Sequence, residues 1–174
     1  MNFPLISGGR VRVTGTTAQA RPELGGVVLE DQIRAFANGS VSGTLQDRVV
    51  RSSRDGSLAF YYRIRELRGG NINQAIVLGD WFLGGHVPSA VDADFRLDGL
   101  GEVGPFQMNF DGSNMLFEFS GWNPPPPPIT PTALSRFMFI IAPGVTEYQT
   151  GGKVTISSTT FSAEIRNCFR PVIR

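Results

Sequence analysis

Apolar and polar residues alternate with a period of two through most of this chain. Successive side chains of a β-strand point to opposite faces, so this spacing is typical of strands that bury one face. No long window sustains the 3.6-residue period of an amphipathic helix, and a helical turn is expected only at residues 22–24. Clusters of Gly, Pro, Asn and Asp separate the apolar runs, as turns separate short strands. We therefore predict an all-β chain.

The clearest local prediction is a β-hairpin formed by residues 41–52 and 57–66. The link between these runs contains Asp55-Gly56, a pair that favours tight hairpin turns. Further strands are predicted at residues 73–83, 90–96, 106–110, 115–120, 136–141 and 154–165.

About ten such strands predict two stacked antiparallel sheets, a sandwich of jelly-roll or immunoglobulin-like architecture, with a closed barrel as the alternative. The 174 residues fit a single domain, residues 1–174. Residues 1–9 and 166–174 lie outside the best-patterned region, and we expect them to form extended terminal arms. Five consecutive prolines lie within residues 122–131. They favour a polyproline II rod without amide donors, which we interpret as a crossover between the sheets.

Charge and hydropathy exclude several classes of partner. The formal net charge is +1, so no global field attracts the chain to nucleic acid or to an anionic membrane. The longest apolar run, residues 137–142, is too short to span a bilayer. We expect no nucleic-acid partner, no membrane span and no cofactor. The single cysteine, Cys168, excludes an intrachain disulfide and is interpreted as a packing residue.

Three carboxylates are the nearest approach to a metal motif. Asp92, Asp94 and Asp98 precede Gly99 in an Asp-x-Asp-x-x-x-Asp-Gly pattern, and hard cations prefer converging oxygen ligands of this kind. The spacing departs from that of an EF-hand loop. Solvated carboxylates on a strand are therefore the preferred interpretation, and a calcium site is the alternative.

Arginines gather on the predicted hairpin, whereas Lys153 is the only lysine of the chain. The acidic residues Asp47, Asp55 and Glu66 interrupt the row. We interpret it as cross-strand ion pairing on a solvated sheet face. The arginines concerned are Arg48, Arg51, Arg54, Arg63, Arg65 and Arg68.

Two stretches carry a resemblance to a known group of proteins. They are residues 58–66 (Leu-Ala-Phe-Tyr-Tyr-Arg-Ile-Arg-Glu) and residues 137–152, which begin Phe-Met-Phe-Ile-Ile-Ala-Pro-Gly and continue to Tyr148 and a Gly-Gly pair. Over about residues 15–155 the chain resembles uncharacterised exported bacterial β-sandwich proteins, exosortase-sorted (PEP-CTERM-type) envelope proteins among them. The resemblance implies an extracellular or matrix-associated role and no known catalytic residues. The chain shows no export signal and no C-terminal Pro-Glu-Pro motif, membrane span or basic tail.

The first functional hypothesis is a non-enzymatic structural protein of the cell surface or extracellular matrix that assembles with itself. Apolar terminal arms have nothing to bury against unless they dock on their own domain or add a strand to a neighbour. We therefore expect a homo-oligomer or polymer. The assembly residues would be Phe3, Leu5, Ile6, Phe169, Val172 and Ile173. A cytoplasmic location stays open.

Two alternatives remain. A carbohydrate- or ligand-binding module would use exposed aromatic rings as a sugar platform, with Trp122 and Tyr148 as the candidates. A sandwich-type hydrolase would need an acidic pair in a cleft, for example Glu118 with Asp80. No motif in the sequence fixes a reaction, so we expect no enzymatic activity.

Overall fold

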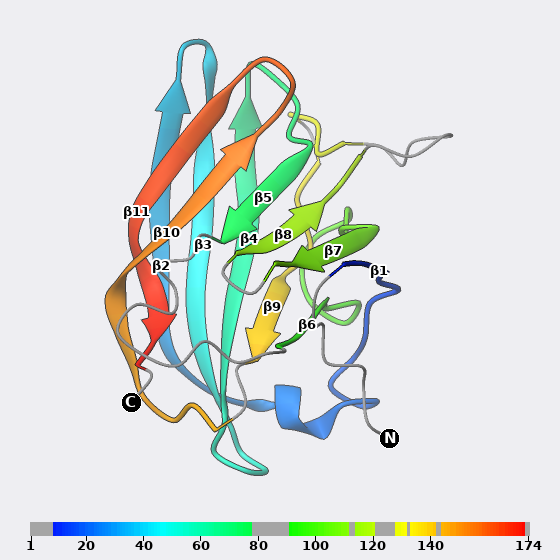
Figure 1. Ribbon diagram of the computed structural model, residues 1–174, viewed down its shortest axis with the longest axis vertical. Helices are drawn as coiled ribbons and strands as arrows, with labels where there is room; N and C mark the ends of the chain where they lie inside the picture. Colours follow the sequence, from blue (N-terminus) through cyan, green and yellow to red (C-terminus); the bar gives the residue numbers. More distant parts are fainter. Residues whose placement is uncertain are drawn as a thin grey trace.

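Two antiparallel sheets stack against each other in the computed structural model (Figure 1), which describes residues 9–77, 91–111, 114–120, 128–131, 133–141 and 144–172. The five-stranded sheet has the order β2 (Gly26–Asn38), β3 (Val41–Ser52), β4 (Leu58–Arg68), β9 (Met138–Ile141) and β6 (Asp92–Phe95). The six-stranded sheet has the order β1 (Arg10–Arg12), β7 (Gln107–Phe110), β8 (Met115–Glu118), β5 (Gln74–Val77), β10 (Tyr148–Ser157) and β11 (Ser162–Pro171). The predicted two-sheet sandwich is confirmed. No helix in the described ranges has the length and apolarity needed to cross a membrane.

The hairpin predicted at residues 41–52 and 57–66 is present, and the strands predicted at residues 106–110 and 115–120 form another. β3 pairs with β4, and β7 pairs with β8, each in an antiparallel register. The expected helical turn is the 3-10 turn η1 (Pro22–Leu24). Residues 154–165 are not the single strand that the sequence predicts. The chain reverses between Ser158 and Phe161, where the Ser158 amide donates to the Phe161 carbonyl at 2.9 Å, so the run is shared between β10 and β11.

The prediction of a C-terminal arm is wrong for residues 166–171. They form the second half of β11, which pairs with β10 along its whole length. The physical reason is burial, because Cys168 and Phe169 are 1% and 4% exposed within the core. Residues 1–8 of the expected N-terminal arm lie outside the described residues, as do residues 122–127 of the expected Pro-rich crossover. Ile129, near the end of that segment, is fully buried and bridges to Ile72.

The principal core fills the space between the two sheets. Alternate residues of each strand point inward, and burial of these apolar side chains is the main force that holds the sheets together. Among the largest fully buried side chains of this core are Leu45, Phe60, Tyr62 and Ile64 from the five-stranded sheet and Phe110 and Phe117 from the six-stranded sheet.

The N-terminal segment passes from one sheet to the other. β1 pairs with β7, and a few residues later the Thr16 amide donates to the Phe95 carbonyl at the edge of β6. Gly15 forms the corner, with a φ of +77° that side chains disfavour. A Cβ on Gly15 would lie 2.6 Å from the Phe95 ring. The corner therefore needs glycine for its conformation and for space.

On the opposite side of the sandwich, β10 and β11 lie across β2 and β3 (Figure 1), and a buried carboxylate joins the two layers. Asp47 on β3 is fully buried, and its Oδ2 accepts hydrogen bonds from Arg34 Nε at 2.8 Å and from the Phe169 amide of β11 at 2.9 Å. Asp47 Oδ1 has no hydrogen-bond partner within the described ranges. Burial outweighs these hydrogen bonds and raises the pKa of Asp47 to about 6.

We expect Asp47 to make a pH-dependent contribution to stability. Because its pKa is higher in the folded than in the unfolded chain, the folded state binds the proton more tightly, and stability from this group falls as pH rises from about 4 to about 6. Asn does not titrate. The free energy of unfolding of Asp47→Asn, measured with urea relative to the unsubstituted protein, should therefore increase between pH 4 and pH 7.

Asp55→Asn provides a control of opposite sign. Hydrogen bonds from Ser57 lower the pKa of the exposed Asp55, so its stabilising contribution appears as pH rises. The stability of Asp55→Asn relative to the unsubstituted protein should fall between pH 3 and pH 5. A pH-independent difference for Asp47→Asn would show that the carboxyl group does not titrate in this range.

Candidate functional site

The outer face of the five-stranded sheet is also apolar. A second buried cluster lies there, made of Leu24, Val50, Ala59, Tyr61, Phe137, Phe139 and Ile141. The cluster comes from β3, β4 and β9, from the residue before β9, and from η1. A strand that is buried on both faces has apolar residues at nearly every position. Residues 58–62 and 137–141 show this pattern.

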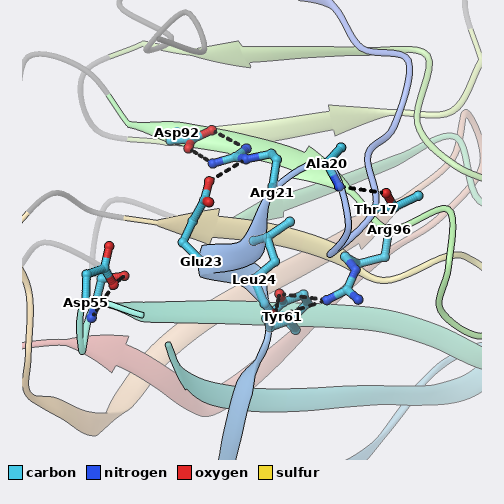
Figure 2. Close-up of polar contacts among 10 residues, drawn as sticks. Thr17, Ala20, Arg21, Glu23, Leu24, Asp55, Tyr61, Asp92 and Arg96 are labelled. Atoms are coloured by element: carbon cyan, nitrogen blue, oxygen red, sulfur yellow. Dashed lines mark hydrogen bonds and ion pairs between the residues drawn. The ribbon is translucent and has the colours of Figure 1, made fainter. Parts of the chain in front are cut away.

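The segment before β2 covers part of this outer face (Figure 2). Arg21 is 2% exposed and reaches β6, where its guanidinium forms a two-pronged ion pair with Asp92, while Arg21 Nε donates to Glu23 at 2.8 Å. The guanidinium carbon also lies 5.4 Å from the centroid of the Phe139 ring. These contacts hold η1 against the sheet, with Leu24 beside Tyr61.

Arg96 fastens the same region from the end of β6. Its Nη1 donates to the Leu24 carbonyl and to the Tyr61 hydroxyl, both at 3.3 Å, and its Nε donates to Asp98 at 2.7 Å. Burial raises the pKa of the Tyr61 hydroxyl, so Tyr61 is neutral over the physiological range. Figure 2 shows the Arg96 guanidinium directed at Tyr61.

Between the start of β2 and the turn after β6 lies a pocket of about 310 Å³. Its residues include an apolar and aromatic group (Val50, Tyr61, Phe137), a group from the η1–β2 junction (Leu24, Gly25, Gly26, Val28), a turn (Gly99, Leu100) and two cations (Arg48, Arg96). Val28 and Leu100 are 48% and 65% exposed, so the pocket also offers solvent-exposed apolar surface.

The charged groups of the pocket are positive. Arg48 Nη2 donates to Asp31 on β2 at 2.7 Å, and the Arg48 guanidinium carbon lies 4.7 Å from the centroid of the Phe137 ring. The lining described above contains two arginines and no carboxylate. The arrangement suits a ligand that places an apolar or ring-shaped part against Tyr61 and Phe137 and a polar part near the arginines.

The three aspartates of the alternative calcium site have separate structural partners. Asp92 pairs with Arg21, Asp94 Oδ1 accepts from the backbone amide of Gly15 at 3.1 Å, and Asp98 Oδ2 accepts from the amide of Ala18 at 2.8 Å. Burial raises the pKa of Asp94, whereas the hydrogen bond from Arg96 lowers that of Asp98. Within the described ranges, no three His, Cys, Asp or Glu side chains form a group that could hold a metal ion. These aspartates fix the segment 15–21 to β6.

The other candidate residues lie away from the pocket. The ring of Tyr148 packs edge-on against Phe169, and its hydroxyl donates to Glu30 Oε1 at 3.0 Å, so it is not an open platform. Glu118 is 5% exposed and is engaged by Gln107 and Arg10. Phe169 is buried, and the Val172 amide donates to the Glu147 carbonyl. Phe3, Leu5, Ile6, Asp80, Trp122 and Ile173 lie outside the described residues.

Sequence reasoning interpreted Arg48 as one member of a solvated row of ion pairs. Its pair with Asp31 is indeed cross-strand, but Arg48 also contacts the pocket residue Phe137. Asp47 points into the core and pairs with Arg34 rather than with an arginine of the hairpin. One sequence signal could have located the site. Residues 58–62 and 137–141 are apolar on both faces of their strands, which indicates that another segment of the chain covers the outer face of the sheet.

Comparisons of the chain with protein-family models, with curated proteins and with solved structures find no match.

We expect Arg21 to be the main anchor of the pocket wall formed by η1. The Arg21→Gln substitution leaves the largely buried Asp92 carboxylate without its cation. Breaking a buried ion pair in this way lowers the free energy of unfolding by about 3–5 kcal/mol. Arg166→Gln is the matched control, because its pair with Glu164 is exposed and such pairs contribute about 0–1 kcal/mol. Urea unfolding of both variants measures the difference. Equal losses would contradict an anchoring role for Arg21.

Proposed function

We propose that this protein is a non-enzymatic ligand-binding β-sandwich module whose binding site is the pocket on the outer face of the five-stranded sheet. The observation that carries the proposal is the pocket itself, about 310 Å³ in size, with aromatic rings, exposed apolar residues and two arginines in its lining. Sites for small molecules combine a concave apolar surface with a few placed polar groups in this way.

Binding rather than catalysis follows from the chemistry of the pocket. Its described lining contains no carboxylate, histidine, cysteine, serine or lysine, the side chains that serve most often as nucleophiles or general bases. The Tyr61 hydroxyl is held neutral by burial and is occupied by Arg96 and the Leu24 carbonyl. The pocket therefore has the means to hold a ligand and lacks a group to attack it.

We expect ring-bearing small molecules to bind in this pocket. A suitable panel contains methyl β-glucoside, methyl β-glucuronide, benzyl alcohol and benzoate, titrated into the ¹⁵N-labelled protein and followed by NMR. Binding should shift the amide signals of Gly25, Gly26, Gly99 and Leu100. Shifts confined to other regions would contradict the proposal.

Gly99 offers a way to block the pocket. A Cβ on Gly99 would lie 3.7 Å from Phe137 Cδ2, in ordinary contact and without an unfavourable φ. Gly99→Leu should therefore fold and fill the pocket, and the affinity for any panel member that binds should fall by at least about tenfold. Gly99→Ala, which adds one methyl group, is the matched control and should retain binding.

The edge strand β2 supports a second candidate, a self-assembling structural protein of the cell surface or extracellular matrix. β2 is 13 residues long and pairs only with β3 in its sheet. Its residues Val27 and Ile33 are 62% and 50% exposed. A long edge strand with exposed apolar residues is a template for a strand of another chain, and this is the feature of the described chain that favours assembly.

We expect assembly through β2 to be sensitive to charge at Ile33. Lysine on an edge strand opposes pairing with another strand, so Ile33→Lys should convert an assembled species into the 18.9 kDa monomer in sedimentation velocity. Leu97→Lys is the control, since Leu97 is 44% exposed but lies outside β2. An unsubstituted protein that sediments as a monomer at all concentrations would contradict the second candidate.

A further inference from the structure

A third arginine lies beside the pocket, and it has no acidic partner among the described residues. Arg63 on β4 is 4% exposed, and its guanidinium carbon lies 5.5 Å from the centroid of the Phe137 ring. Its Nε donates to the Ser135 carbonyl at 3.1 Å. In the part of the chain that the structure describes, no carboxylate forms an ion pair with Arg63. Burial, reinforced by Arg65 and Arg48, lowers its pKa, as expected for a cation without a counter-charge.

The charges around Phe137 do not balance. Arg48 pairs with Asp31, and Arg96 pairs with Asp98. Among the described residues, the positive charge of Arg63 is left without a counter-charge. A buried charge that no partner compensates is costly, so its retention is explained if an anion supplies the missing charge.

A second, independent feature of the same site is an unused donor. Arg48 Nε is buried and has no hydrogen-bond partner among the residues that the structure describes, although Arg48 Nη2 is bound to Asp31. Buried donors in folded proteins are almost always satisfied by protein, water or ligand. Because Arg48 lines the pocket, a small movement of its guanidinium on binding would present this Nε–H to an acceptor oxygen of a bound molecule.

Resting on the proposed function, we infer that the pocket selects a ligand that carries a carboxylate on a ring. The ring lies against Tyr61 and Phe137, and a carboxylate oxygen accepts from Arg48 Nε while Arg63 and Arg96 supply favourable charge. An acidic sugar and an aromatic acid share this chemistry. The two matched pairs of the panel distinguish these sources, because each acid differs from its neutral counterpart in one –CH₂OH group oxidised to –COO⁻.

Isothermal titration calorimetry with the full chain, in buffer free of phosphate and sulfate, compares each acid with its neutral counterpart. The acid of at least one pair should bind at least about tenfold more tightly, as charge-assisted hydrogen bonds are stronger than neutral ones. A preference for methyl β-glucuronide identifies an acidic sugar, and a preference for benzoate identifies an aromatic acid.

Three variants test the residues. Arg48→Lys keeps the positive charge and the pair with Asp31 but removes the Nε–H, and should reduce the acid-to-neutral affinity ratio at least about threefold. Arg63→Gln removes the uncompensated charge and should reduce the ratio by a similar factor. Arg65→Gln is the control, because its side chain is 32% exposed and its charge is screened by solvent, so the ratio should be unchanged.

Thermal melting without ligand separates binding from folding. Arg63→Gln should melt no lower than Arg65→Gln, because it relieves an unpaired buried charge, whereas a purely structural Arg63 would lower the melting temperature. Equal affinity of acid and neutral ligands would overturn the carboxylate inference and leave the proposed binding function intact. If no panel member bound, or if Gly99→Leu bound each as the unsubstituted protein does, both would be overturned.

Discussion

Apolar side chains occupy both faces of the paired strands β4 and β9, and much of the fold follows from the need to cover both. The inner face is covered by the six-stranded sheet. The outer face is covered in part by the short segment around η1, which Arg21 fastens to Asp92 on β6. The pocket lies where this cover meets the turn after β6, with Tyr61 and Phe137 in its lining. The candidate site is thus a product of the same apolar pattern that builds the sandwich.

The buried polar groups fall into two kinds. Asp47 lies between the sheets and accepts hydrogen bonds from Arg34 and from the Phe169 amide, so donors from both sheets stabilise its carboxylate. The nearby Cys168 thiol has its pKa raised to about 12 by burial and by Asp47, which makes it an unreactive packing residue, as the sequence predicts. In contrast, Arg63 has no carboxylate partner, and the Nε of Arg48 has no hydrogen-bond acceptor, among the described residues. The first kind serves the fold, and the second is the basis of the ligand that we propose.

Local pattern was sufficient for much of the fold. The Asp-Gly pair at 55–56 and the alternation on either side of it specify the β3–β4 hairpin, because turn chemistry and strand period act over a few residues. The boundary of β11 was missed, since a four-residue turn within 154–165 carries no Gly or Pro. The site was harder to foresee. Arg21 pairs with Asp92, which lies 71 residues further along the sequence. Arg63 is buried and Arg65 is more exposed because of tertiary packing, which the local sequence does not reveal. Which arginine is left without a carboxylate depends on packing that no local pattern encodes.

The passage of the N-terminal segment from one sheet to the other has a consequence for biogenesis. Strands β2, β3 and β4 are consecutive neighbours and need only contiguous chain to pair. Gly15, by contrast, finds its hydrogen-bond acceptor on Asp94, 79 residues further on. During synthesis, residues 10–16 therefore emerge well before their partners on β6 and β7, and contacts so distant in sequence form late. Nascent chains arrested before β6 has emerged would display the β2–β4 meander before most strands that cover its inner apolar face have been made, which makes that stage of synthesis the one most in need of a chaperone.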